Sequence, residues 1–409
     1  RFRLCSGSRQ SFGNSMDYKA LAITLKIILA RLIQLDFVGI NRLARVNTMF
    51  DAEKIVQNFV SIRDLFDFKD VELDTSNPTP LPENPQPLPD QFNWGGAVIS
   101  LSEWQTARSV CGMVVLKNGE RAYEAYFNET TQHDRRISWS MSKSVLSIAI
   151  GVLHDQGRLP PLGTPIGQIV PSLRDSAYAN ATLRNVLNMA SGVAFNEDYL
   201  DFHSDINRMG RIIGTGGSMD TFAQGMVAQE WAPGTYNHYV SIDTHVLGMV
   251  LRAVSGQDLD AFIRDHVFAK LGLETAPYFV ADSLQEPFIL GGLNMMTRDY
   301  ARIGLMMVQK GEIAGNRVIS TDWVQRSTSQ SAPPPDPARA AMADGVLGYG
   351  YQWWLPPNPT QGEYFAIGIY GQYIYIDTAR QVVIAINSAD RDFKDGDGQI
   401  TLNNIQLFR

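Results

Sequence analysis

The residues best suited to chemistry stand together at the start of an apolar segment. The sequence "SWSMSKS", residues 138–144, places four serines and one lysine in seven positions and runs directly into "VLSIAIGVL". If this segment is helical, residues three apart share a face, so Ser140 and Lys143 project together. None of the other three serines has a lysine three positions later. The spacing therefore favours Ser140 as the partner of Lys143.

The expected position of Lys143 opposes its charged form. In the first turn of a helix an ammonium group faces the positive end of the helix dipole, and the apolar residues that follow deprive it of water. We expect its pKa to fall from about 10.4 toward the range of roughly 7–8 in which an amine serves as a base. A neutral amine can take the hydroxyl proton of Ser140, and backbone N–H groups at the helix start can stabilise an oxyanion. Because a Ser-x-x-Lys match also occurs by chance, the pair alone leaves open an exposed lysine that points to water.

A Ser-Lys pair of this kind commonly recruits a third proton-handling group, often a tyrosine followed two residues later by Asn or Ser. Three tyrosines fit this pattern, namely Tyr126, Tyr178 and Tyr239. Tyr126 falls on a predicted β-hairpin and Tyr178 in a polar loop. Tyr239 follows the turn sequence in "WAPGTYNH" and stands at the start of a strongly periodic helix, where a Pro-Gly turn would fix the phenol near a helix N-terminus. We therefore predict Tyr239 as the partner.

Five segments, taken in order, resemble the β-lactamase-related serine hydrolases. They are "SWSMSKS", "TLRNVLNMASG", "PGTYNHYVSIDTHVLGMVLRAVSG", "GGLNMMTRDYARIGLMMVQKGE", and "GYGYQWW" followed by "GIYGQYIYID". This family includes class C β-lactamases, D-Ala-D-Ala peptidases, family VIII carboxylesterases and 6-aminohexanoate-dimer hydrolases, and the resemblance covers about residues 95–390. It implies that Ser140 is the acylated nucleophile, that Lys143 and Tyr239 share the proton shuttle, and that Ser241 supports it.

The family's third motif is a strand that carries a basic residue two positions before a glycine. The matching strand here is "FAIGI", in which Gly368 fits the motif glycine and Ala366 stands where the basic residue would be. The resemblance implies that the backbone N–H of Ile369 pairs with that of Ser140 as an oxyanion hole. Because relatives use the missing cation to grip a substrate carboxylate, Ala366 argues against penicillin-like acids and favours esters, or amides without a carboxylate there.

The loop "FNEDYLDFHSD", residues 195–205, is a candidate substrate-binding segment. A comparable loop in the 6-aminohexanoate-dimer hydrolases places a tyrosine over the scissile amide, a position that Tyr199 occupies here. We predict substrate-binding roles for Tyr199, Asp198 and Tyr370. The acidic residues of the loop are Glu197, Asp198, Asp201 and Asp205, and they could attract an ammonium group. A solvated acidic loop with Tyr199 packed beneath it remains the alternative.

Charge and cysteine content narrow the classes of function. The net charge is −7 and there is no lysine-rich run, so we expect no nucleic-acid partner, because phosphate binding needs a basic face. Cys5 and Cys111 offer neither a disulfide framework nor a zinc motif. His238 and His245 lack a matching acidic or cysteine ligand. We therefore predict no metal and no other cofactor.

The order of the predicted elements indicates an α+β fold of the β-lactamase/transpeptidase type, with an antiparallel sheet flanked by helices and an inserted helical subdomain. We assign residues 95–157 and 311–409 to the sheet domain and residues 158–310 to the helical subdomain. Residues 16–94 supply N-terminal helices and a connector with six prolines between positions 77 and 89, and residues 1–15 are an extension without fold signal. Alternating apolar residues around Asn118-Gly119 predict a hairpin with a type I′ turn.

The segment 18–38, "YKALAITLKIILARLIQLDFV", is apolar but is interrupted by Lys26 and Arg31. It is therefore a poor spanning helix, and a weak signal or anchor, an amphipathic surface helix and a helix docked on the body remain open. Membrane association through this segment and a homodimer are both left open, and a periplasmic or membrane-associated location is slightly favoured over a cytoplasmic one.

These features together predict a serine hydrolase that forms an acyl-enzyme with carboxylic esters of small acyl groups. The alternative is an amidase or peptidase on linear amides such as 6-aminohexanoate oligomers. A β-lactamase or D-amino-acid peptidase is a weaker alternative, and a non-catalytic scaffold of the cell envelope belongs to a different class. A Ser-His-Asp hydrolase is disfavoured, because no serine has glycine at both minus two and plus two.

Overall fold

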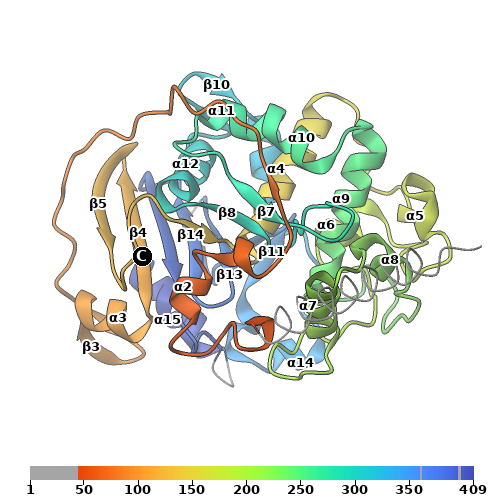
Figure 1. Cartoon of the computed structure of the whole chain (residues 1–409), viewed down its shortest axis with the longest axis horizontal. Helices are drawn as coiled ribbons and strands as arrows, with labels where there is room; N and C mark the ends of the chain where they lie inside the picture. Colours follow the sequence, from red (N-terminus) through yellow and green to blue (C-terminus); the bar gives the residue numbers. More distant parts are fainter. Residues whose placement is uncertain (1–44, 360–361, 395–397) are drawn as a thin grey trace, which may run out of the picture.

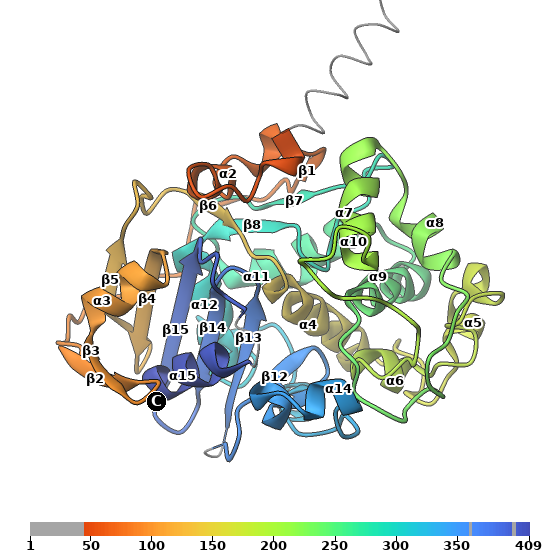
Figure 2. The same cartoon turned by 90° about the horizontal axis from the view of Figure 1, so that it is seen from below.

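The computed structural model describes residues 45–359, 362–394 and 398–409. The fold is α+β, as predicted: a seven-stranded antiparallel sheet with helices on both faces lies beside a mainly helical part (Figure 1). Helix α4, Met141–Asp155, lies between the sheet and the helical part (Figure 2). The segment "SWSMSKS" thus begins where the two parts meet.

The central sheet combines strands that are far apart in the sequence. In spatial order they are β11 (Gly348–Gly350), β12 (Trp353–Leu355), β13 (Glu363–Gly368), β14 (Gln372–Asp377), β15 (Val382–Ser388), β4 (Val110–Lys117) and β5 (Glu120–Tyr126). The pairing of β15 with β4 joins the C-terminal strands to the earlier hairpin. In that hairpin Asn118 and Gly119 have φ values of 54° and 83°. Both lie in the left-handed region that a type I′ turn requires, which confirms the predicted turn.

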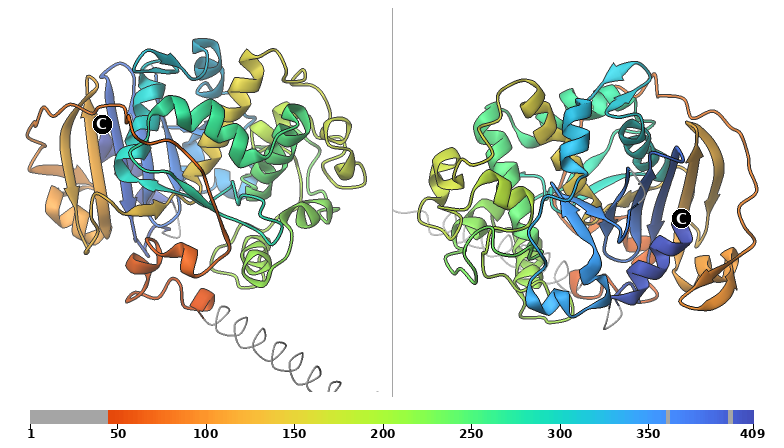
Figure 3. Two further views of the ribbon diagram at one scale, coloured as in Figure 1. Left: turned by 45° about the horizontal axis from the view of Figure 1, so that its top comes forward. Right: turned by 180° about the vertical axis from the view of Figure 1, so that it is seen from behind.

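Helices cover both faces of this sheet (Figure 3). Helix α12 (Thr297–Val308) packs on β4, β14 and β15, and α3 (Leu101–Ala107) and α15 (Gln399–Phe408) lie on the opposite face. Gly304 allows a close approach of α12, since a β-carbon there would lie 2.3 Å from the side chain of Val383. We predicted that the helical subdomain extends to residue 310, but α12 is part of the cover of the sheet. The apolar periodicity of this helix would be the same whether it packed on the sheet or within the helical subdomain, so the sequence did not distinguish the two positions.

A smaller sheet positions the residues before Ser140. Its strand order is β1 (Phe68–Asp70), β7 (Tyr278–Val280), β8 (Leu293–Met296) and β6 (Arg135–Ile137). Ser138, which follows β6, donates its backbone N–H to the carbonyl of Leu293 at 2.8 Å. Two short hairpins complete the strands: β2 (Gln91–Trp94) with β3 (Ala97–Ser100), and β9 (Glu312–Ile313) with β10 (Asn316–Arg317).

The helical part contains one long helix beside several short ones. The helices are α5 (Ile166–Ile169), α6 (Leu183–Leu187), α7 (Asp205–Thr215), α8 (Met219–Gln224), α9 (Ser241–Ser255), α10 (Leu259–Ile263) and α11 (Ala269–Leu271), with α13 (Thr321–Ser327) and α14 (Pro337–Ala340) later in the chain. Helix α9 packs on α4, α6 and α8. It ends at Gly256, whose φ of 66° lies in the left-handed region that favours glycine at a helix C-terminus.

The N-terminal region has less helix than its pattern predicts. The N-terminal helices predicted within residues 16–94 are represented between residues 51 and 64 by a single turn, α2 (Ile55–Asn58), followed by a 3₁₀ turn (Ile62–Asp64). The proline-rich connector, residues 77–89, is extended and makes an isolated bridge between Glu83 and Arg121. Residues 1–15 and 18–38 lie outside the described residues. Within the described ranges no helix has the length and apolar character needed to cross a membrane.

Candidate active site

Ser140 differs from the other serines of its segment in where its hydroxyl lies. Ser138, Ser142 and Ser144 each donate a hydroxyl to a backbone carbonyl, those of Trp139, Ile289 and Gln352 respectively. The Ser140 hydroxyl oxygen instead lies 2.9 Å from Nζ of Lys143. Ser140 is the residue immediately before α4. The structure therefore places Lys143 in contact with Ser140, the serine that the spacing favoured.

Lys143 is held in a dry position. Its side chain is 2% exposed, and its amine also contacts the carbonyl oxygen of Leu290 at 2.8 Å. Burial lowers the pKa of Lys143 to about 7, although the negative charge of Glu197 acts in the opposite direction. A substantial fraction of the amine is then neutral at neutral pH, so it can accept a proton from Ser140.

Tyr239 approaches the same hydroxyl from the start of α9. The amine of Lys143 lies 5.3 Å from the centre of its ring, and the ring stacks on Trp354 at 5.4 Å. Burial, followed by the charge of Glu197, raises the pKa of Tyr239 above its usual value, and a hydrogen bond with Ser140 acts against this rise. The phenol is therefore protonated at neutral pH and can donate.

The other two candidate tyrosines lie elsewhere. Tyr126 donates to Glu124 on the same strand, and Tyr178 donates to the buried Asp243 at 2.7 Å. Neither lines a pocket that contains Ser140. The structure thus brings Ser140, Lys143 and Tyr239 together.

The end of β13 passes close to the nucleophile segment. A β-carbon on Gly368 would lie 2.3 Å from the carbonyl oxygen of Ser138, so only glycine allows this approach. The next residue, Ile369, lines both pockets that contain Ser140. The backbone N–H groups of Ser140 and Ile369 donate to no other described residue. This geometry suits an oxyanion site between them.

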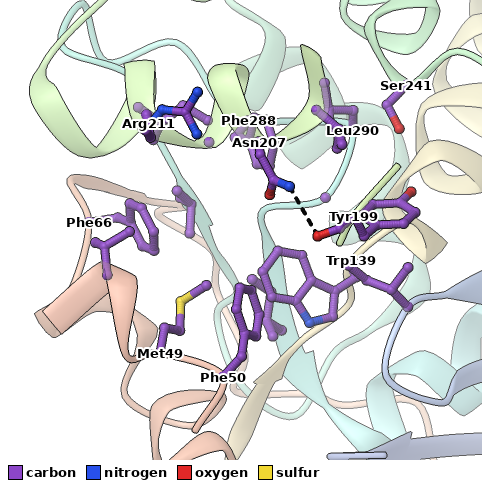
Figure 4. Close-up of a pocket in the computed structure, with 18 of the residues that line it drawn as sticks. Met49, Phe50, Phe66, Trp139, Tyr199, Asn207, Arg211, Ser241, Phe288 and Leu290 are labelled. Atoms are coloured by element: carbon purple, nitrogen blue, oxygen red, sulfur yellow. Dashed lines mark hydrogen bonds between the residues drawn. The ribbon is translucent and has the colours of Figure 1, made fainter. Parts of the chain in front are cut away.

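Ser140 lies where two pockets meet. One is a mainly apolar cavity of about 310 Å³, here called the acyl cavity, lined by Trp139, Phe50, Phe66, Phe288 and Leu290 among others (Figure 4). The other, of about 460 Å³, is lined by more charged side chains and is for that reason here called the polar cleft; it includes Tyr239, Glu197, His238, Asp336, Arg339, Trp354 and Lys394. Ser140, Tyr199 and Ile369 line both. A carbonyl group at Ser140 could therefore extend one arm into each pocket.

Comparison with known proteins identifies the family to which this architecture belongs. The beta-lactamase family model matches residues 103–406. The chain belongs to the beta-lactamase family. It is 30% identical over 280 residues, 66% of this chain and 70% of the relative, to the 6-aminohexanoate-dimer hydrolase of Paenarthrobacter ureafaciens.

Solved structures agree on the fold of this beta-lactamase-family hydrolase. A Bacillus anthracis protein, provisionally described as a 6-aminohexanoate-dimer hydrolase, superposes with a TM-score of 0.74 at 20% identity, over 88% of this chain and 94% of that one. A family VIII carboxylesterase superposes with a TM-score of 0.56 at 15% identity, over 75% and 95%. These likenesses concern the fold alone.

Glu197 was predicted only as one of four acidic residues of its loop, and its position beside Ser241 and Tyr199 was not predicted. Its carboxylate accepts hydrogen bonds from the backbone N–H of Ser241 at 2.9 Å, from the Ser241 hydroxyl, and from the Tyr199 hydroxyl at 2.6 Å. Its charge also acts on the pKa values of Lys143 and Tyr239. Glu197 therefore holds the start of α9 through its hydrogen bonds with Ser241, and its negative charge acts on the two ionisable groups beside Ser140.

The proposed substrate-binding residues are placed differently from one another. Tyr199 lines both pockets, whereas Asp198 lines the polar cleft and lies 3.9 Å from Lys394. Tyr370 was predicted to contact substrate but lines neither pocket. Its φ of 60° accompanies a ring packed against Phe50 at 4.8 Å and Phe393 at 4.6 Å. Tyr370 thus supports the aromatic wall of the site.

Two neighbouring tryptophans and the two histidines near Tyr239 also differ in their surroundings. Trp353 is fully buried in the core, whereas its neighbour Trp354 lines the polar cleft. His238 faces Asp336 at 3.1 Å and His245 faces Asp220 at 2.7 Å, so the two histidines have separate partners. Within the part of the chain that the structure describes, no three His, Cys, Asp or Glu residues form a group suited to a metal ion.

The Glu197→Gln variant tests the electrostatic role of this partly buried carboxylate. Since the carboxylate stabilises the ammonium form of Lys143, removing its charge should lower the lysine pKa and move the acid limb of kcat/KM from near pH 7 to lower pH. The weakened bonds to Ser241 and Tyr199 should also lower the plateau roughly tenfold. Asp201→Asn removes a charge from the same loop away from Lys143 and should leave the limb in place. An unmoved limb in Glu197→Gln would contradict this role.

Proposed function

We propose that this protein is a serine hydrolase that forms an acyl-enzyme at Ser140 and acts on carboxylic esters of small acyl groups. The observation that carries the proposal is the buried Lys143 amine 2.9 Å from the Ser140 hydroxyl. The amine has a pKa of about 7, and the pair opens onto both the acyl cavity and the polar cleft.

The reaction proceeds in two stages. Ser140 attacks the ester carbonyl while its proton passes to neutral Lys143, and the N–H groups of Ser140 and Ile369 stabilise the tetrahedral oxyanion. The bond to the alcohol then breaks, and the alcohol leaves with a proton from Tyr239, which regains one from Lys143. Water hydrolyses the acyl-enzyme by the same route in reverse, releasing the acid and restoring Ser140.

The roles of base and acid follow from the two pKa directions. Lys143 has a pKa lowered to about 7 and is the group able to accept a proton from Ser140. The pKa of Tyr239 is raised, so a tyrosinate base is disfavoured. Its phenol is instead suited to donate to the leaving group. We therefore assign the base to Lys143 and the donor to Tyr239.

The composition of the β13 strand supports esters over penicillin-like acids. Ala366 is fully buried and places no cation beside Ser140. The cleft residue that follows on this strand is Ile367. A substrate carboxylate would gain no ion pair from the strand that provides one in relatives.

A substrate panel tests the proposal. The protein should hydrolyse 4-nitrophenyl esters of short acids most efficiently, cleave 6-aminohexanoate dimer more slowly, and leave a chromogenic cephalosporin essentially intact. Intact-mass measurement during ester turnover should show a covalent acyl adduct. Efficient cleavage of the cephalosporin would contradict the argument from Ala366.

An amidase is the second candidate, because the 30%-identical relative carries the name of an amide hydrolase and Tyr199 lies beside Ser140 in both pockets. Faster turnover of the amide dimer than of esters would favour it. Absence of both ester and amide turnover, together with no labelling by a fluorophosphonate, would favour a non-catalytic scaffold.

A further inference from the structure

The two pockets can be assigned to the two arms of the substrate. Tyr239, the proposed donor to the leaving group, lines the polar cleft and not the acyl cavity. A leaving group that receives its proton from Tyr239 must lie on the cleft side. The acyl arm therefore extends into the acyl cavity.

The acyl cavity is apolar with a single charged exception. Its walls come from the N-terminal segment, from α7 and from the loop before β8, and include Met49, Phe50, Ile206 and Phe288. Arg211 on α7 is the only charged residue among the described residues that line it. Figure 4 shows Arg211 on one side of the cavity and Ser241, beside the nucleophile region, on the other.

Arg211 has unused hydrogen-bonding capacity. Its Nη1 donates to the carbonyl of Phe202 at 2.6 Å, and the guanidinium lies over the Phe202 ring at 4.1 Å. A guanidinium has five N–H donors, and no carboxylate of the described chain lies within 4.0 Å of this one. The neighbouring Arg208, by contrast, pairs with Asp205 at 3.2 Å.

We propose that the acyl cavity selects acyl chains whose far end carries a carboxylate, with Arg211 as the binding partner of that group. This inference rests on the proposed function. The preferred substrates are then monoesters of dicarboxylic acids: the apolar walls bury the methylene chain, and the guanidinium takes the terminal carboxylate in a charge-assisted contact.

The same geometry disfavours an acyl arm that ends in an ammonium group. Such an arm would place a cation beside Arg211 in a mainly apolar cavity. The 6-aminohexanoate dimer has this arrangement, because its acyl half carries the free amine. The acidic residues of this site lie in the polar cleft instead, on the side assigned to the leaving group.

Three esters with one leaving group and matched chain length test the inference. They are mono-4-nitrophenyl adipate, 4-nitrophenyl hexanoate and 4-nitrophenyl 6-aminohexanoate, with the suberate, octanoate and 8-aminooctanoate esters as a longer set. In at least one set kcat/KM should be highest for the anionic arm and lowest for the cationic arm. Arg211→Met should reduce kcat/KM for the anionic arm roughly tenfold or more and change that for the neutral arm little. Arg211→Glu should reverse the order and favour the ammonium arm.

Arg208→Met serves as the matched control on the same helix and should leave the order unchanged. An equal loss for all three esters in Arg211→Met would mean that Arg211 only holds the Phe202 loop, and it would overturn the inference. Equal rates for the three arms in the unchanged protein would do the same. Absence of turnover for every ester would instead contradict the proposed function itself, so the two failures are distinguishable.

Discussion

The Ser140→Ala variant is expected to hydrolyse esters roughly 10⁵- to 10⁶-fold more slowly than the unchanged protein, down to the background of the assay. This is the size of effect seen when a serine hydrolase loses its nucleophile. The variant lacks the Ser140 hydroxyl that contacts Lys143. The other three serines of the segment already donate their hydroxyls to backbone carbonyls, so they do not replace it. Intact-mass measurement with a fluorophosphonate should show an adduct on the unchanged protein and none on Ser140→Ala.

Ser144→Ala is the matched control for this experiment. Ser144 is buried one turn further along α4 and donates to the carbonyl of Gln352 at 2.7 Å. It lines neither pocket, so its removal should leave labelling intact. An adduct that persists in Ser140→Ala, or that disappears in Ser144→Ala, would show that Ser140 is not the nucleophile.

The part of the site that could be predicted from sequence is the part fixed by local geometry. Ser140 and Lys143 share a helical face because of their spacing, and a lysine at the head of an apolar helix must lose water wherever that helix packs. Tyr239 could be chosen over Tyr126 and Tyr178 because a Pro-Gly turn before a periodic helix fixes its position. Gly368, by contrast, was identified through the resemblance of its strand to the family motif and not from local geometry.

The residues that escaped prediction depend on tertiary packing. The acidic loop contains four carboxylates, and only the hydrogen bonds with Ser241 and Tyr199 distinguish the partly buried Glu197 from the exposed Asp198. The aromatic wall of the acyl cavity includes Phe50, from a segment with little regular structure. Its contact with Tyr370 joins residues more than 300 positions apart. The periodicity of apolar residues along the sequence does not indicate such a contact.

The Lys143→Met variant is expected to lose roughly 10³- to 10⁴-fold in kcat/KM, because it removes the base while keeping a similar volume in the core. The acid limb near pH 7 should disappear with it, since that limb reports the Lys143 amine. Below the limb the unchanged protein carries an ammonium that cannot accept a proton, and above it the neutral amine can. The pH profile of the residual activity measures this directly. Thermal unfolding should show an equal or higher Tm, because burying an amine costs free energy that methionine does not require.

Lys143→Arg separates proton transfer from simple charge. Arginine keeps a positive charge and N–H donors near Ser140 but does not deprotonate in proteins. If the amine acts as a base, this variant should be as inactive as Lys143→Met, provided that its circular dichroism and Tm show a folded protein. If instead a folded Lys143→Arg variant retained activity within tenfold of the unchanged protein, the positive charge alone would be sufficient. The base would then have to be another group, and Tyr239, despite its raised pKa, would be the remaining candidate beside Ser140.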